Sequence, residues 1–188
     1  VIKIIATANV QGEVDPCGWP KNPLGGLARK ATILDEISEK YSNAFIVDAG
    51  NLFFSEETLE PGIPGEKSVI NVDIIIESLN IMGLTAFSPG VKDFSAGNDF
   101  LLSIVAKSEF PYISANIYDL NNDLLFDPYI IREKNGLKIA FIGLSSVFSS
   151  EGIIVKDPLE SLQNVLYEVE SKSDLKILLF SSTNKEID

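Results

Sequence analysis

In Ala44-Phe45-Ile46-Val47-Asp48-Ala49-Gly50-Asn51 an apolar run leads directly into a polar turn, and this pattern indicates the fold class. Such a run predicts a strand that is buried on both faces, as in a parallel sheet. A similar run, Val1-Ile2-Lys3-Ile4-Ile5-Ala6, opens the chain. Residues 25–41, between the two runs, carry apolar side chains at spacings of three and four, which predicts a helix. Strand, helix and strand in this order predict a parallel βαβ unit.

The rest of the chain continues the alternation. The predicted elements are, in order, a loop at 61–65, a helix at 69–82 stopped by Gly83, a strand at 85–87, a helix near 97–107, a strand at 112–115, a hairpin over 129–142 turning at Asn135-Gly136, a helix at 158–171 and a strand at 175–180. We therefore expect the α/β class, with a mostly parallel or mixed sheet, flanking helices and one β-hairpin. Residues 1–188 are expected to form a single domain.

Composition excludes several kinds of function. The chain has 188 residues and a formal net charge of −12, which argues against a nucleic-acid partner. It contains one cysteine and no histidine, which excludes an internal disulfide, a His-based catalytic triad and His-ligated metals. No apolar run reaches the roughly 18 residues that a membrane span requires, so we expect no membrane span.

Ligands of parallel α/β sheets collect at the carboxyl ends of the strands. The segments to consider are therefore Thr7–Gly12, Asp48–Asn51, Ser88–Phe94 and Ser181–Thr183. These segments carry mostly amides rather than carboxylates and histidines. A hydrolase that used two carboxylates, Asp48 and Asp93, would need a defined separation and a raised pKa, and the sequence supports neither.

Several segments agree in order and spacing with one family pattern. They are Thr7-Ala8-Asn9-Val10-Gln11-Gly12, Gly25-Gly26-Leu27-Ala28-Arg29, Asp48-Ala49-Gly50-Asn51-Leu52-Phe53, Asn80–Gly83, Ser88–Gly97, Phe110–Asn116, Gly136–Leu144 and Leu178–Thr183. Together these segments resemble the N-terminal metallophosphoesterase (calcineurin-like) domain of the bacterial 5′-nucleotidase family. The Gly-Gly-Leu-Ala-Arg motif is unchanged. Thr-Asn-Asp-x-His-Gly is altered at three positions, Ala8, Asn9 and Gln11, and Asp-Ala-Gly-Asp is altered at Asn51 alone.

The resemblance implies a metallo-dependent phosphatase-like layered sandwich of α/β/β/α type. The chain corresponds to the first part of the family domain and is short at its C-terminal end. We therefore expect the remainder of a longer chain, a partner chain or a second copy to cover the open sheet, and we predict that the chain as given is not a free monomer. The contact is expected near Ile142 and Leu178. The resemblance also implies a periplasmic or extracellular location, although a cytoplasmic one stays open.

The departures from the family pattern lie at the metal site. The resemblance implies two divalent metals such as Mn, Zn or Mg, held by Asp, His and Asn side chains. The former metal-site positions are Asn9 for Asp, Gln11 for His, Asn51 for the bridging Asp, Val91 for Asn and Ser182 for His. Lys92 stands where the resemblance places the catalytic His, and Asp93 follows it. We expect neither a bound metal nor any catalytic residue, because a dimetal site requires several charged ligands at once.

Other residues near these motifs have more than one interpretation. Lys92 either attracts an anion or neutralises Asp48 or Asp93, and we favour neutralisation. Gly25-Gly26 either forms an anion nest or serves packing, and we favour packing. Cys17 is open to roles as a reactive thiol, a metal ligand or a partner contact, but an ordinary loop cysteine is favoured. Trp19, in the same loop, is a candidate to cover the site or a partner surface.

Two hypotheses about function remain. The favoured one is a catalytically inactive protein that acts as a binding or structural component, with Cys17, Trp19 and Asp48 as candidate ligand or partner contacts. The alternative is an active metal-dependent phosphoester hydrolase with substituted ligands. Its candidate ligands would be Asp15, Cys17, Asp48 and Asp93.

Overall fold

A computed structural model of the 188-residue chain describes residues 2–18, 24–41 and 44–182. The elements are β1 (Lys3–Thr7), α1 (Leu27–Lys40), β2 (Ala44–Asp48), α2 (Ile63–Met82), β3 (Ala86–Phe87), a 3₁₀ turn η1 (Val91–Phe94), α3 (Asn98–Val105), β4 (Ile117–Asp119), β5 (Tyr129–Lys134), β6 (Leu137–Ser145), β7 (Ile153–Val155), α4 (Pro158–Val169) and β8 (Leu175–Ser181). Of the helices in the described ranges, none has both the length and the apolar character needed to cross a bilayer.

The strands form two main sheets whose registers bring strand ends together. In the first sheet, β1, β2 and β3 are parallel neighbours, and Thr7 at the end of β1 is in register with Asp48 at the end of β2. In the second sheet, β5 and β6 form the predicted antiparallel hairpin, and β8 runs parallel to β6. Ser145 and Ser181 are in register at the ends of β6 and β8. A separate antiparallel pair joins β4 and β7.

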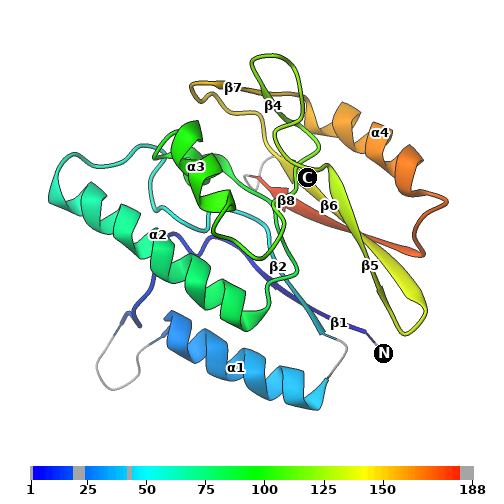
Figure 1. Cartoon of the computed structure of the whole chain (residues 1–188), viewed down its shortest axis with the longest axis horizontal. Helices are drawn as coiled ribbons and strands as arrows, with labels where there is room; N and C mark the ends of the chain where they lie inside the picture. Colours follow the sequence, from blue (N-terminus) through cyan, green and yellow to red (C-terminus); the bar gives the residue numbers. More distant parts are fainter. Residues whose placement is uncertain (1, 19–23, 42–43, 183–188) are drawn as a thin grey trace.

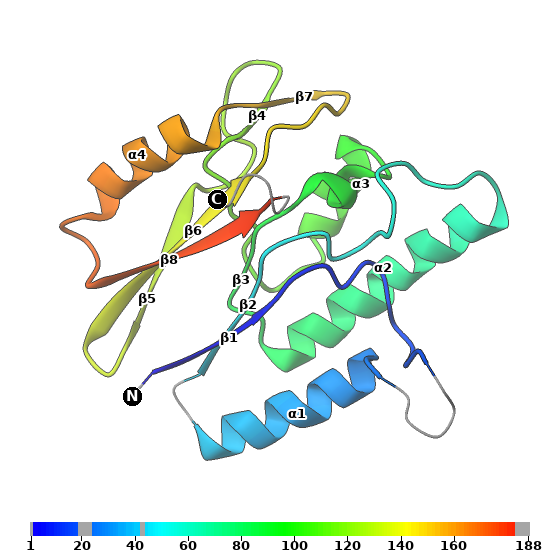
Figure 2. The ribbon, with the colours of Figure 1, turned by 180° about the vertical axis from the view of Figure 1, so that it is seen from behind.

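The two sheets and the helices stack in four layers (Figures 1 and 2). Helices α1, α2 and α3 pack against one face of the first sheet, where Ile46 of β2 joins Ile75 of α2. Because successive side chains of a strand point to opposite faces, Val47 of β2 lies between the two sheets, against Phe141 of β6. The other face of β6 packs against α4. The layered α/β/β/α class predicted from the sequence is therefore confirmed.

Helix α2 begins six residues earlier than predicted. The loop prediction for residues 61–65 is wrong from Ile63 onward, because Ile63, Pro64 and Gly65 form the first turn of the helix. Proline is tolerated there, since the first helical N–H groups have no partner inside the helix. The predicted stop is confirmed: Gly83 adopts the left-handed conformation, with φ of 70°.

One predicted strand is wrong, and two short strands have no counterpart in the prediction. Residues 112–115 form no strand and make only single parallel bridges, from Tyr112 to Phe87 and from Ile113 to Asp127. Strands β4 and β7 were not predicted, because each has three residues and pairs across more than 30 positions of sequence. Runs this short carry no periodicity that a sequence can reveal.

The predicted association surface is only partly exposed. Ile142 lies on β6 and is 1% exposed, so the expectation that it lies at a contact is wrong. It faces α4, in one cluster with Val165 and Val169. Leu178 on the edge strand β8 is 42% exposed. On α4 the predicted apolar face is also narrower than expected, because Leu159 and Leu166 are exposed.

Candidate functional site

The segments that follow β1 and β2 are joined by their main chains. The Asn9 N–H donates to the Gly50 carbonyl, and the Gln11 N–H donates to the Asn51 carbonyl, both at 2.9 Å. Asn9, Gln11 and Asn51 all have positive φ, between 53° and 57°. Asparagine tolerates this left-handed conformation, but glutamine seldom adopts it. Uncommon backbone of this kind is concentrated at functional sites of proteins.

The side chain of Asn51 is held at both polar ends. Its Nδ2 donates to Oδ1 of Asn9 at 2.9 Å, and its Oδ1 accepts the Lys92 N–H at 3.1 Å. The three residues come from the ends of β1 and β2 and from η1. Former metal-site positions that lie far apart in the sequence are therefore adjacent in the fold.

Glycine allows the two sheets to approach each other at this point. A Cβ on Gly50 would lie 2.8 Å from Ser181 Oγ and 2.8 Å from the Gly90 nitrogen. Real Cβ atoms do not approach other atoms so closely. The close approach brings the end of β8 beside the ends of β2 and β3.

A hollow of about 490 Å³ opens where these strand ends meet. It is lined by Asn51, Glu57, Val91, Lys92, Ser145, Ser146, Val147, Phe148, Ser149, Ser181 and Ser182. Among the predicted positions, Asn51, Val91, Lys92 and Ser182 line the hollow, and Asn9 is hydrogen-bonded to Asn51. Gln11 is not among the lining residues, although its main chain is bonded to Asn51.

The sequence prediction missed the end of β6 and the segment after it, which contribute Ser145 and residues 146–149. The same strand-end rule would have found it, because β6 runs parallel to β8 and ends at the same edge. Asn116 fixes this segment: its Nδ2 donates to the Ser145 carbonyl at 2.6 Å, and its Oδ1 accepts the Ser145 N–H at 3.0 Å. Within the described residues, the buried Oγ of Ser145 has no hydrogen-bond partner.

Asp93 lies beneath the site and supports its main chain. Its carboxylate accepts the N–H groups of Asn51, Leu52, Phe53 and Gly90 at 2.7–3.0 Å. Complete burial raises the pKa of Asp93 to about 7, although these four N–H groups favour the ionised form. Asp93 therefore holds the loop that carries Asn51 and has no free oxygen directed at the hollow.

Asp48 is also buried and is held by other partners. Its carboxylate accepts the Thr7 hydroxyl at 2.6 Å and the Gly50 N–H at 3.0 Å. Burial raises the pKa of Asp48 and lowers the pKa of Lys30, whose Nζ donates to Thr7 Oγ1 at 3.1 Å. Lys30 is the cation whose charge favours the Asp48 carboxylate.

The predicted partner of Lys92 is wrong. Its Nζ donates to the Ser55 carbonyl rather than to Asp48 or Asp93. The ion pairs of the described ranges join Asp73 to Lys107 and Glu170 to Lys176. Backbone N–H groups and Thr7 satisfy the two buried carboxylates, so neither requires a lysine at position 92.

The alternative ligand set of Asp15, Cys17, Asp48 and Asp93 does not come together. Asp48 and Asp93 are buried and bonded as described, whereas Cys17 is exposed in a loop where its N–H donates to the Leu24 carbonyl at 2.8 Å. Across the described ranges, no group of three or more His, Cys, Asp or Glu side chains is placed to hold a metal ion. Trp19 lies outside the described residues.

Known proteins share both this sequence pattern and this fold. The chain is 28% identical over 165 residues to a 5′-nucleotidase of Vibrio cholerae and 29% identical over 176 residues to the NAD 5′-nucleotidase of Haemophilus influenzae. These matches cover 82% and 88% of this chain. Its homologues are 5′-nucleotidases and calcineurin-like phosphoesterases. The resemblance predicted from the motifs is thereby confirmed, and no protein-family model matches the chain.

Solved structures of the same group share the fold. The NAD nucleotidase of H. influenzae superposes with a TM-score of 0.82 at 21% identity. The match covers 99% of this chain and 35% of the nucleotidase chain. The 5′-nucleotidase precursor of Thermus thermophilus also gives 0.82, at 20% identity, over 99% of this chain and 38% of its own. The chain spans less than a third of the length of the two curated 5′-nucleotidases.

Proposed function

We propose that this chain is a non-catalytic relative of the 5′-nucleotidases, in which the hollow at the strand ends binds an uncharged, hydroxyl-bearing ligand. The observation that carries the proposal is the bond between Asn51 Nδ2 and Asn9 Oδ1. It places an amide-to-amide contact where the family resemblance implies that two cations are held.

The residues present do not fit a pair of divalent cations. Hard dications are held close together by carboxylates, whose charge offsets the repulsion between the two ions. Here Asn51 uses its Oδ1 for the Lys92 N–H and directs its Nδ2 donor at Asn9, while Val91 supplies no ligand atom. The Lys92 side chain adds positive charge to the lining of the hollow.

The lining of the hollow favours a neutral polar ligand. Ser149 and Ser181 contribute hydroxyl groups, and the charges of Glu57 and Lys92 offset each other. Ser149 is exposed, so its hydroxyl is accessible to a ligand hydroxyl. Phe148 supplies an apolar surface in the same hollow. A nucleoside, which has hydroxyls and an aromatic base but no phosphate, has this chemistry.

Metal and substrate assays on the purified 188-residue chain test the proposal. The 5′-nucleotidase of V. cholerae serves as a positive control for hydrolysis of a 5′-nucleotide. We expect no stoichiometric Mn²⁺ after equilibrium dialysis and no hydrolysis of AMP or p-nitrophenyl phosphate with added Mn²⁺. Stoichiometric Mn²⁺ together with turnover that Asn51→Ala abolishes would overturn the proposal in favour of the metal-dependent hydrolase.

Calorimetry with adenosine and AMP tests the ligand class. Adenosine is expected to bind at least as tightly as AMP, because no cation is present to attract the phosphate. Ser149→Ala should weaken adenosine binding, whereas Ser103→Ala, on the exposed face of α3, should leave it unchanged. AMP binding much more tightly than adenosine would refute the neutral ligand.

Export also belongs to this proposal. The structural relative from T. thermophilus is described as a 5′-nucleotidase precursor, and the family resemblance implies a periplasmic or extracellular location. Fractionation of the native cells with an antibody against this chain is expected to place it outside the cytoplasm. Its recovery with cytoplasmic marker enzymes would contradict export.

A further inference from the structure

Helix α2 carries a line of exposed isoleucines. The exposed fractions of Ile63, Ile70, Ile74 and Ile81 are 80%, 63%, 42% and 86%. Their spacings of seven, four and seven residues place them on one side of an α-helix. The opposite side of the same helix is buried in the core, through Val72, Ile75, Ile76 and Leu79. An apolar line on the solvent side of a surface helix marks an interaction surface.

Two charged residues complete a coiled-coil pattern on this line. Lys67 lies between Ile63 and Ile70, Glu77 lies between Ile74 and Ile81, and both are exposed. The order Ile63, Lys67, Ile70, Ile74, Glu77, Ile81 has alternating spacings of four and three, which are the spacings of the d and a positions of a heptad. We call these six residues the α2 seam. No residue of the seam lines the hollow at the strand ends.

The seam is symmetric about Val72. If a second helix lies antiparallel and is centred on the same residue, Ile63 faces the partner's Ile81 and Ile70 faces the partner's Ile74. Lys67 then faces the partner's Glu77, and the twofold axis repeats this pair. In a parallel arrangement Lys67 would instead face the partner's Lys67, and Glu77 the partner's Glu77. Like charges therefore disfavour the parallel arrangement, and opposite charges favour the antiparallel one.

We infer that two copies of this chain associate through the α2 seam as an antiparallel helix pair. Each apolar layer joins an isoleucine to an isoleucine, and each polar layer joins a lysine to a glutamate. A twofold interface requires that a residue i contacts j while j contacts i, and the seam meets this requirement at all six positions. The seam extends from Ile63 to Ile81, which is 18 residue steps, or about 27 Å along the helix axis.

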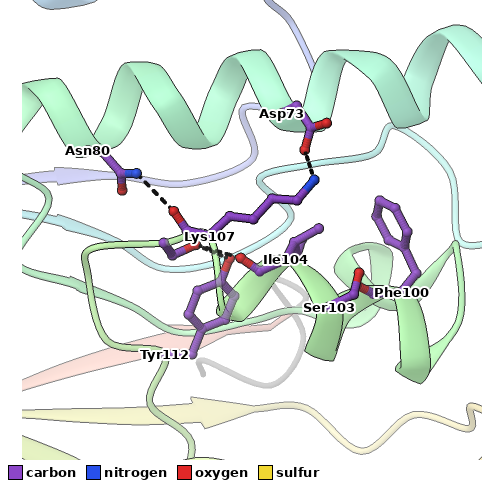
Figure 3. Close-up of polar contacts among 8 residues, drawn as sticks. Asp73, Asn80, Phe100, Ser103, Ile104, Lys107 and Tyr112 are labelled. Carbon is purple, nitrogen blue, oxygen red and sulfur yellow. Dashed lines mark hydrogen bonds and ion pairs between the residues drawn. The ribbon is translucent and has the colours of Figure 1, made fainter.

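The flanks of the seam are held by the rest of the fold. Figure 3 shows Asp73 and Asn80 of α2 directed toward Lys107, which follows α3. Asn80 Nδ2 donates to the Lys107 carbonyl at 3.0 Å, and Lys107 Nζ lies 2.7 Å from Asp73 Oδ1. Asp73 would lie near the twofold axis, close to the partner's Asp73, and the Lys107 charge reduces the repulsion between them. The contacts with Lys107 also fix the orientation of the seam.

Sedimentation velocity on the whole 188-residue chain tests the inference. Because one helix from each copy makes a small interface, the measurement should cover about 1–300 µM. We expect a reversible monomer–dimer equilibrium. Lys67→Glu and Glu77→Lys should each raise the dimer Kd about tenfold or more, because each places like charges in two layers. The double variant K67E/E77K should restore the dimer.

The charge variants are suitable because they change little within one copy. Lys67 and Glu77 lie ten residues apart, so they do not pair with each other in the same helix. A lysine at position 77 would even face Asp73, four residues earlier, and so should not weaken the helix. Leu178→Lys, on the exposed part of β8, is the control for association through the sheet edge and should leave the dimer Kd unchanged.

Cross-linking reports the direction of the pair. In a Cys17→Ser background, a mixture of the Ile63→Cys and Ile81→Cys variants should form a disulfide dimer, whereas either variant alone should not. Disulfide formation by Ile63→Cys alone would show a parallel pair and overturn the inference. A monomer at the highest concentration, or a dimer that Leu178→Lys dissociates and Lys67→Glu does not, would also overturn it.

Discussion

Asn51 donates from Nδ2 to the Oδ1 of Asn9 at 2.9 Å, across the ends of β2 and β1. The two residues are 42 positions apart in the sequence, and the parallel register of Thr7 with Asp48 brings them together. Because both side chains are neutral, the bond requires no cation. Substitutions at this contact can therefore test whether the site binds a metal ion.

Asn51→Asp should make the stability of the chain depend on Mn²⁺. The new carboxylate would lose the Nδ2 donor and would face Asn9 Oδ1 with a negative oxygen. We expect a lower melting temperature than in the wild type, which added Mn²⁺ partly restores. Differential scanning fluorimetry with and without about 1 mM Mn²⁺ measures the effect, since a ligand that binds only the folded state stabilises it. A wild-type chain that responds to Mn²⁺ as strongly as the variant would contradict this prediction.

Asp93 should make the chain less stable as the pH rises from about 4 to about 7. Burial raises the pKa of Asp93 from an ordinary value of 3.8 to about 7 in the folded state, so the folded state binds more protons in this window. The contribution of the Asp93 proton to the free energy of unfolding is fully present below pH 3.8 and is lost as the pH rises through 7. Its size is roughly 4 kcal/mol at most, at 1.36 kcal/mol per pKa unit.

Urea unfolding of the Asp93→Asn variant at several pH values measures this contribution. The variant should be less stable at every pH, because its amide nitrogen cannot accept the four N–H groups. Its free energy of unfolding should also fall less steeply between pH 4 and 7. Glu39→Gln, which removes an exposed carboxylate, should keep the wild-type slope. Equal slopes in the wild type and Asp93→Asn would contradict the raised pKa.

Gly50→Ala should destabilise the chain more than Gly97→Ala. Both glycines have positive φ, 101° and 88°, so each substitution strains the backbone. Only at Gly50 would the new Cβ also meet Ser181 Oγ and the Gly90 nitrogen at 2.8 Å, whereas nothing lies within 4 Å at Gly97. We expect a loss of about 1 kcal/mol for Gly97→Ala and about 2–4 kcal/mol for Gly50→Ala. Chemical denaturation of the two variants provides the comparison.

Ile75→Ala and Ile81→Ala should separate the two faces of α2. Ile75 is fully buried in the core, so its truncation should cost about 2–5 kcal/mol. Ile81 is 86% exposed, and at low protein concentration its truncation should change the free energy of unfolding by less than about 0.5 kcal/mol. Thermal unfolding at about 1 µM, where association is weak, makes this comparison. A large loss for Ile81→Ala under these conditions would show that it packs within a single copy.

Secondary-structure elements with a clear local pattern of apolar or turn-forming residues could be predicted from the sequence alone. The run Ala44–Val47 lies within β2, Asn135-Gly136 forms the turn of the hairpin, and Gly83 ends α2 in the left-handed conformation. Each of these depends on neighbouring residues only, through burial of both strand faces or through the positive φ that glycine and asparagine accept. The order of these elements, together with the motifs, was enough to predict the layered α/β/β/α class.

The hydrogen-bond partners of the polar groups at the site depend on the tertiary structure and could not be predicted from the sequence. The partners of Asp93 are the N–H group of Gly90 and three main-chain N–H groups that lie 40 to 42 residues earlier. Because every residue except proline has a main-chain N–H group, the sequence does not reveal which of them Asp93 binds. Lys92 reaches Ser55 rather than a carboxylate, and Ser145 enters the hollow because Gly50 and Gly90 let the two sheets converge. The physical reason is that hydrogen bonds depend on distances of about 3 Å between atoms far apart in the chain. Sequence periodicity fixes the face of an element, but the packing of the two sheets fixes these distances.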